Sequence, residues 1–118
     1  MSTTSVGRRG EALAREYLEK AGYVTLRQNF RSGPREIDLI MLDGETTVFV
    51  EVKSRSKTRY GTPAEFVTPA KQRQLTLAAE AYLLAEHGRM DCSARFDVVE
   101  VYLESGEIHH IPNAFFAR

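Results

Sequence analysis

The stretch Thr46-Thr47-Val48-Phe49-Val50-Glu51-Val52-Lys53 is an apolar run that ends in two charged side chains. Its β-branched and aromatic residues predict a buried strand. Residues two apart on a strand point to the same face, so Glu51 and Lys53 share one face of the predicted sheet. A buried charge is costly unless it is paired or bound to a metal, so these two side chains are the first candidates for chemistry.

A second predicted strand, residues 35–42, precedes this run and carries Asp38 among apolar neighbours. The dipeptide Asp43-Gly44 between the two strands is a strong hairpin signal. A two-residue loop at Asp43-Gly44 makes Asp38 the diagonal neighbour of Glu51, and a four-residue loop places the two directly opposite each other. Either even loop therefore brings the carboxylates together on one face, whereas an odd loop would separate them.

The remaining pattern predicts two helices and three more strands. Thr68 as the N-cap, Pro69 at the first position and Gly88 at the end give the second helix clear boundaries. The order helix, three strands, helix, two strands predicts an α/β fold with a mixed sheet flanked by helices. At 118 residues, the chain is expected to form one domain, residues 1–118. Helices are expected at residues 5–21 and 69–87, and strands at residues 23–29, 35–42, 46–54, 96–103 and 108–111.

Helical spacing turns one acid of the first helix toward the sheet. Stepping back by three and by seven residues from Ala14 and Leu18 reaches Glu11, which is flanked on the helix by Gly7 and Gly10, two small residues that leave room for close approach. The alternative interpretation is an acid in the first turn that the helix dipole stabilises. The apolar stripe expected to face the core is Ala14, Tyr17, Leu18 and Ala21.

The same reasoning places two polar residues of the second helix near the strands. Stepping back from Leu75 reaches Lys71 and Gln72, at the inward N-terminal end, where both can approach the two carboxylates. The apolar stripe expected for this helix is Leu75, Ala78, Ala79 and Tyr82.

Two carboxylates this close repel each other, and a divalent cation would hold both ionised. Mg²⁺ takes oxygen ligands, typically one or two carboxylates, waters and substrate phosphate, so Asp38 and Glu51 are candidate ligands. Glu11 is expected to join them through a metal-bound water. Lys53 is placed to orient a water or to stabilise charge on a phosphate. The alternative interpretation is a buried ion pair of Lys53 with Glu51 or Asp38, without catalysis.

Several motifs of the chain occur together in one known family. They are Gly10-Glu11-Ala12-Leu13-Ala14, Asn29-Phe30-Arg31, Glu36-Ile37-Asp38-Leu39-Ile40, Phe49-Val50-Glu51-Val52-Lys53-Ser54-Arg55 and Arg95-Phe96-Asp97-Val98-Val99. With these motifs the chain resembles the small bacterial YraN family, also catalogued as UPF0102, from about Gly7 to Val101. The arrangement of Asp38 and Glu51-Val52-Lys53 after a helix acid also resembles the PD-(D/E)XK nuclease superfamily, whose fold is called restriction-endonuclease-like.

The resemblance implies a fold and roles for matching residues. The family is similar to archaeal Holliday junction resolvases, in which the matching acid pair binds Mg²⁺ or Mn²⁺ and the matching lysine lies beside the scissile phosphate. It implies metal binding by Asp38, Glu51 and Glu11, and catalytic roles for these three acids and Lys53. The chain departs from the pattern in two places, with Pro34-Arg35 where the family usually has Gly, and Ile37 where the superfamily has Pro.

Basic residues gather in the first two thirds of the chain. Residues 1–79 hold 13 Lys and Arg against 9 Asp and Glu, whereas residues 80–118 hold 3 against 7. Such asymmetry indicates a positive patch for phosphates, and the alternative interpretation is a solvated loop at residues 53–59. The candidate nucleic-acid-binding residues are Arg31, Arg35, Arg55, Lys71 and Gln72.

Other functional classes lack support in the sequence. No apolar run approaches the roughly 18 residues that a membrane helix needs, and the first ten residues lack an apolar signal core. Cys92 is the single cysteine and has no partner for an internal disulfide, which fits a reducing compartment. We therefore expect a cytoplasmic protein without a membrane partner.

The leading hypothesis is a Mg²⁺- or Mn²⁺-dependent endonuclease that acts on DNA, including branched DNA. If the substrate is a four-way junction, a homodimer is expected, because two-fold symmetry matches two cuts. The rival hypothesis is a nucleic-acid-binding or adaptor protein that keeps the fold without turnover, and the net charge of zero supports it. A third hypothesis is a structural domain whose buried ion pair only specifies the fold.

Overall fold

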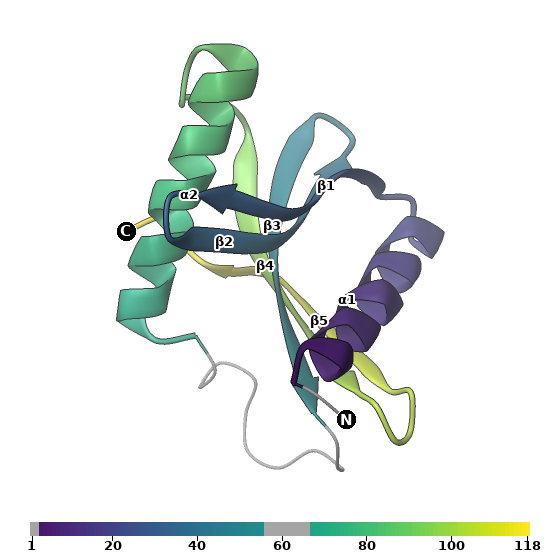
Figure 1. Cartoon of the computed structure of the whole chain (residues 1–118). Coiled ribbons are helices and arrows are strands. Elements are labelled where there is room, and N and C mark those ends of the chain that lie inside the picture. The colour runs from purple at the N-terminus through teal and green to yellow at the C-terminus, as the bar shows by residue number, and fades with distance from the viewer. Residues whose placement is uncertain (1–2, 56–66) are drawn as a thin grey trace.

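The computed structural model describes residues 3–55 and 67–118, which form a five-stranded mixed sheet and two helices (Figure 1). The α/β class with helices flanking a mixed sheet is confirmed, and this architecture matches a restriction-endonuclease-like fold. The elements are α1 (Thr3–Lys20), β1 (Val24–Ser32), β2 (Arg35–Asp43), β3 (Thr46–Arg55), α2 (Pro69–His87), β4 (Ala94–Tyr102) and β5 (Ile108–Phe115).

The strands lie in the order β1-β2-β3-β4-β5, so that neighbours in space are neighbours in sequence. Every pair is antiparallel except β3 and β4, which run parallel. Parallel neighbours need a crossover connection, and α2 lies in that connection. Because of this crossover, the end of β3 and the start of α2 are both available to build a site.

The two helices cover opposite faces of the sheet (Figure 1). Ala14 and Leu18 of α1 pack on apolar side chains of β2, β3 and β4 to form one core cluster. The apolar face of α2 packs on the other side of the same strands, and every residue of its expected stripe is buried. That buried face consists of Leu75, Ala78, Ala79, Tyr82 and Leu83.

The predicted hairpin turn between β2 and β3 is displaced by one residue. Asp43 pairs with Thr46, so the turn consists of Gly44 and Glu45 rather than Asp43 and Gly44. Gly44 adopts φ +61°, which suits glycine at the first position of a two-residue turn. The resulting register is the one in which Asp38 faces Glu51 directly.

Two strands are longer than expected. β1 continues to Ser32 and turns at Gly33-Pro34, where a loop over residues 30–34 was predicted, because Phe30 packs into the core under α2. β5 continues past Ile111 to Phe115, and the ring of Phe115 stacks on that of Phe96, 4.8 Å between centroids. Tertiary packing therefore extends strands whose local sequence signals ended earlier.

The expected stripe of α1 is partly wrong. Tyr17 is 40% exposed and Ala21 lies beyond the helix end, while the buried positions Gly10, Ala14 and Leu18 recur every four residues. Gly10 is buried because α1 touches the end of β3 there, and a Cβ on Gly10 would lie 1.8 Å from Oγ of Ser54. The small residue expected to allow close approach is thus Gly10; nothing lies within 4 Å of a Cβ on Gly7.

Within the described part of the chain, neither helix is long and apolar enough to cross a membrane.

Candidate active site

Asp38 and Glu51 meet where the ladder between β2 and β3 ends. The last paired residues on this side are Leu39 and Val50, and the next positions in that register are Asp38 and Glu51. The backbone N–H of Val52 donates a hydrogen bond to Oδ2 of Asp38 at 2.8 Å. The predicted proximity of the two carboxylates is therefore confirmed. The Asp38 side chain of β2 accepts the backbone N–H of β3 that a strand carbonyl would otherwise accept.

Burial and like charges raise the pKa of Asp38 to about 8. Burial is the largest cause, the charge of Glu51 is the second, and the charge of Glu11 and a hydrogen bond with the Glu51 carboxyl add to it, while the bond from Val52 acts in the opposite direction. At neutral pH the Asp38 carboxyl therefore holds a proton.

Glu51 is 6% exposed and is flanked by two ammonium groups. Nζ of Lys53 lies 3.5 Å from Oε2 of Glu51, and Nζ of Lys71 lies 3.6 Å from the same oxygen. Lys71 reaches the site from the first turn of α2, where its backbone N–H donates to Oγ1 of the N-cap Thr68. The predicted approach of Lys71 from the second helix is confirmed.

Glu11 lies beside the acid pair and is held by an asparagine. Nδ2 of Asn29 donates to Oε1 of Glu11 at 2.8 Å and to Oε1 of Glu36 at 3.1 Å. Asn29 has φ +50°, a left-handed conformation that asparagine tolerates better than most residues. Sequence reasoning did not single out Asn29, although its amide connects α1, β1 and β2.

The three acids do not form a single metal-binding cluster. Across residues 3–55 and 67–118, no three side chains from His, Cys, Asp and Glu lie close enough together to hold a metal ion. Asp38 and Glu51 form a pair, and Glu11 acts on Asp38 through its charge while bonded to Asn29. The expected contact of Glu11 with a metal through a water stays a prediction.

The candidate nucleic-acid-binding arginines differ in their partners within the protein. Arg31 is exposed and its Nη2 lies 3.3 Å from Oε2 of Glu36, in the pocket that Glu11 also lines. Nε of Arg55 lies 3.8 Å from Oε2 of the buried Glu100. Arg35 is half-buried at the β1–β2 turn, and its Nε has no hydrogen-bond partner in the described structure.

The side chain of Gln72 makes its hydrogen bonds with residues other than the acid pair. Its Nε2 donates to the carbonyl of Val67 at 2.9 Å, and its Oε1 accepts from Nε of Arg118 at 2.6 Å. The structure thus brings Lys71 to Glu51 and turns its neighbour toward the C-terminal residue, as expected for consecutive residues of a helix.

The structure also contains a buried polar network that sequence reasoning missed. Asp97 is fully buried and accepts hydrogen bonds from Nε of Arg95 at 3.0 Å and the backbone N–H of Asn113 at 2.9 Å, and its Oδ2 lies 2.7 Å from Nε2 of His110. The bonds from His110, Asn113 and Arg95 lower the pKa of Asp97 against the effect of burial. The signal was present in the sequence, since Asp97 is an acid within an apolar strand, like Asp38.

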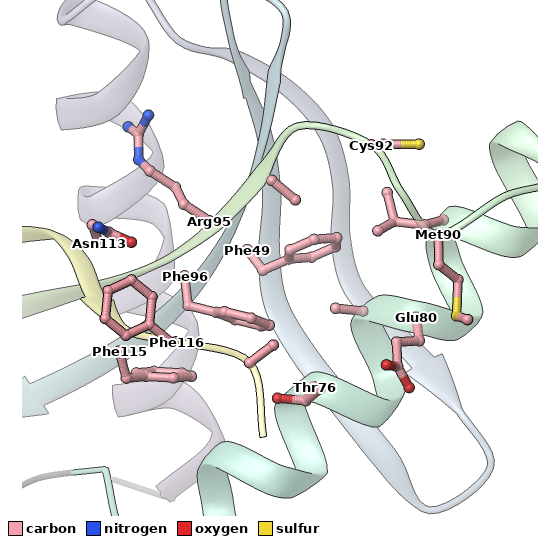
Figure 2. A pocket seen from close by; sticks show the side chains of 14 residues that line it. Phe49, Thr76, Glu80, Met90, Cys92, Arg95, Phe96, Asn113, Phe115 and Phe116 are labelled. Atoms are coloured by element: carbon pink, nitrogen blue, oxygen red, sulfur yellow. The ribbon is translucent and has the colours of Figure 1, made fainter.

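A separate pocket of about 230 Å³ lies between α2 and the end of β5 (Figure 2). Figure 2 shows the rings of Phe49, Phe96 and Phe115 gathered at this pocket, with Met90 at its edge. Its lining contains none of the predicted site residues. The predicted site residues therefore lie apart from this pocket.

Comparison with known proteins gives one consistent result. A family model described as "Uncharacterised protein family UPF0102" matches residues 10–101. A UPF0102 protein of Chlorobium chlorochromatii is 46% identical over 99% of this chain and 95% of its own length. Relatives from Geobacter metallireducens and Bifidobacterium longum, also UPF0102 proteins, are 47% and 48% identical over 94% and 92% of this chain and 92% and 91% of their own lengths.

Proposed function

The chain belongs to the uncharacterised protein family UPF0102, and from this premise we propose that it is a metal-dependent endonuclease that hydrolyses DNA phosphodiester bonds. Branched DNA, such as a four-way junction, is the proposed substrate class. The observation that carries the proposal is the pair of the half-buried Asp38 and the buried Glu51, with Nζ of Lys53 at 3.5 Å from Oε2 of Glu51. A structural ion pair needs one acid and one base, whereas this site places a second carboxyl against the first.

The residues present fit Mg²⁺ or Mn²⁺. Both ions prefer oxygen ligands, and the side chains of Asp38 and Glu51 supply carboxylate oxygens on adjacent strands. The raised pKa of Asp38 supports the same assignment, because burial and the charge of Glu51 favour a proton on this carboxyl, and a divalent cation would take the place of that proton. Asp38 and Glu51 would hold the ion, and Glu11 would contact it through water.

The ion would act as a Lewis acid and lower the pKa of a bound water. Lys53, on the same face as Glu51, would orient the attacking water or stabilise negative charge on the phosphate. Lys71 would contact the phosphate backbone of the nucleic acid when Glu51 holds the ion instead of Lys71. The hydrogen bond from Val52 would keep Asp38 in place throughout, since it comes from the backbone of the strand that carries the other two groups.

Cationic side chains around the pair support a nucleic-acid substrate. Arg31, Arg55 and Lys71 lie on β1, β3 and α2, the elements that surround the acid pair. Phosphate contacts from such residues position a strand without reading its sequence. With a four-way junction as substrate, we propose a homodimer, because a two-fold axis relates the two cuts.

A second candidate function is a nucleic-acid-binding adaptor without turnover. It is favoured by the contacts of Glu51, whose carboxylate already has the ammonium groups of Lys53 and Lys71 as partners without an ion. Such a site can persist without an ion. Binding of DNA without cleavage would support this candidate.

The decisive experiment is a cleavage assay on duplex, flap and four-way-junction DNA with Mg²⁺ or Mn²⁺. Cleavage by the wild type is expected, with loss in Glu51→Gln and Lys53→Ala. Glu45→Gln is the matched control, because Glu45 is an exposed acid in the turn of the same hairpin. Cleavage that survives both site substitutions would come from a contaminant or another site and would reject the assignment.

Metal binding is tested independently by calorimetry with Mn²⁺. The wild type is expected to bind and Asp38→Asn to lose binding, because the amide has one oxygen and no charge. Absence of binding in the wild type, or equal binding by both proteins, would argue against a metal site at this pair.

A further inference from the structure

We propose that the polar pocket beside Glu11 is a subsite for a backbone phosphate of a nucleic-acid strand, adjacent to the phosphate at the acid pair. Arg8 and Arg31 are its cationic residues. The inference rests on the proposed function, because that function makes the ligand a nucleic-acid strand. The pocket has a volume of about 410 Å³ and is lined by Gly7, Arg8, Glu11, Asn29, Arg31 and Glu36.

The pocket adjoins the acid pair through two of its lining residues. Glu11 lines the pocket and also acts electrostatically on Asp38. Asn29 lies between the paired positions Gln28–Leu39 and Phe30–Ile37, which places it opposite Asp38 in the β1–β2 register. A nucleic-acid strand that runs from the acid pair across the end of β2 would therefore reach this pocket next.

Two consecutive arginines of α1 have different surroundings. Nη2 of Arg9 donates to the carbonyl of Leu103 at 3.3 Å. Arg8 is exposed, lines the pocket and has neither an ion pair nor a hydrogen bond to any residue of the described ranges 3–55 and 67–118. An arginine without a protein partner beside a polar pocket is available to an anion from outside.

The charges of the pocket leave room for one anion. Arg31 is 3.3 Å from Glu36, and Asn29 donates to Glu36 and to Glu11, so both carboxylates have partners within the protein. Arg8 is the charged residue of the pocket without a partner among the described residues. A phosphodiester carries one negative charge, and its oxygens suit the paired donors of a guanidinium.

The test compares two single-arginine variants with the same charge change. Binding of fluorescent duplex and four-way-junction DNA is measured by anisotropy with EDTA present, between about 50 and 200 mM salt. The plot of log affinity against log salt is expected to be less steep in Arg8→Gln than in the wild type. The magnitude of its negative slope should decrease by about 0.9, since one phosphate contact is lost. Arg9→Gln, whose native side chain is bonded to Leu103, is expected to keep the wild-type slope.

Several results would overturn the subsite. They are a wild-type slope in Arg8→Gln, an equal decrease in both variants, or no DNA binding by the wild type. Inorganic phosphate that binds the wild type and not Arg8→Gln would reassign the pocket to free phosphate and overturn its assignment to a strand. Failure of the proposed function has a different signature, since an Arg8-dependent slope without cleavage would keep the subsite and favour the adaptor.

Discussion

The backbone N–H of Val52 bonds to Oδ2 of Asp38 at 2.8 Å, so an acidic side chain takes the place of a ladder carbonyl at the end of β2 and β3. The bond fixes Asp38 to the strand that carries Glu51 and Lys53. It also explains how a carboxyl with a strongly raised pKa keeps a defined position, because the acceptor oxygen is bonded whether or not the other oxygen holds a proton. The same bond lowers the pKa of Asp38, but burial and the charge of Glu51 outweigh it.

The raised pKa of Asp38 predicts that stability falls as pH rises. The carboxyl has a pKa of about 8 when folded and 3.8 as its ordinary value, so between these values the folded protein holds a proton that the unfolded chain releases. This group alone should make the metal-free protein on the order of 4 kcal/mol less stable at pH 7 than at pH 4. Urea unfolding in EDTA at several pH values measures the effect.

Asp38→Asn serves as the comparison for that measurement. The variant lacks the titrating group, so its stability should decrease less than that of the wild type between pH 4 and pH 8. Parallel pH curves for the two proteins would show that Asp38 titrates near its ordinary value.

Two glycines of α1 should respond in opposite ways to alanine. Gly10→Ala should destabilise the protein by about 1–3 kcal/mol, because its Cβ would overlap Oγ of Ser54 and force α1 away from β3. Gly7→Ala should stabilise it by about 0.5–1 kcal/mol, because the position is helical and a Cβ there meets nothing. Urea midpoints for both variants measure this contrast, and a gain in both would show that the helix adjusts freely.

Asn29 should influence metal binding through Glu11. Asn29→Gly permits the left-handed backbone and removes the amide that holds Glu11, so Mn²⁺ affinity should fall by about tenfold, as for loss of a partner outside the ligands themselves. Asn113→Gly is the matched control, because Asn113 has φ +51° in β5. Equal affinities for both variants would assign Asn29 a backbone role only.

Lys71 should compete with the ion for Glu51. Removing its charge in Lys71→Gln frees Oε2 of Glu51 from one of its two ammonium neighbours, so Mn²⁺ should bind more tightly by a few-fold while DNA binding weakens. Arg73→Gln is a suitable control, since this cation of the same helix bonds to Arg118 instead. Weaker Mn²⁺ binding by Lys71→Gln would indicate that Lys71 supports the metal-bound site rather than the metal-free one.

The buried network around Asp97 should support the fold rather than the reaction. Asp97→Asn should destabilise the protein by about 1–3 kcal/mol, because the buried carboxylate that accepts from Arg95 and Asn113 is lost while Arg95 keeps its ion pair with Asp43. Asp91→Asn, which affects an exposed pair with Arg89, should change stability little. Denaturant unfolding measures both, and cleavage by folded Asp97→Asn should remain that of the wild type.

The sequence was sufficient for the acid pair because β-strand parity is a strict constraint. The apolar residues around Asp38 and Glu51 define two strands, and any even loop places both acids on one face. The two-residue turn lies one residue later in the chain than expected, and the conclusion still holds. The boundaries of α2 were equally accessible, since Thr68, Pro69 and Gly88 act locally.

Features that depend on distant residues were not accessible in the same way. The left-handed conformation of Asn29 and its two carboxylate partners follow from the docking of α1 on β1 and β2, which no local pattern encodes. Likewise, Gln72 and Lys71 looked equivalent in sequence, yet the C-terminal Arg118 occupies one and Glu51 the other.

The crossover through α2 gives the site an order of assembly. Asp38 and Glu51 belong to one hairpin, which forms through local contacts, whereas Lys71 arrives only when α2 docks and β4 pairs with β3. Local contacts close at a lower entropic cost than distant ones and tend to form earlier. The nascent hairpin must therefore bring two carboxylates together before their lysine from α2 is available, so a divalent cation that binds this pair should accelerate folding as well as stabilise its product.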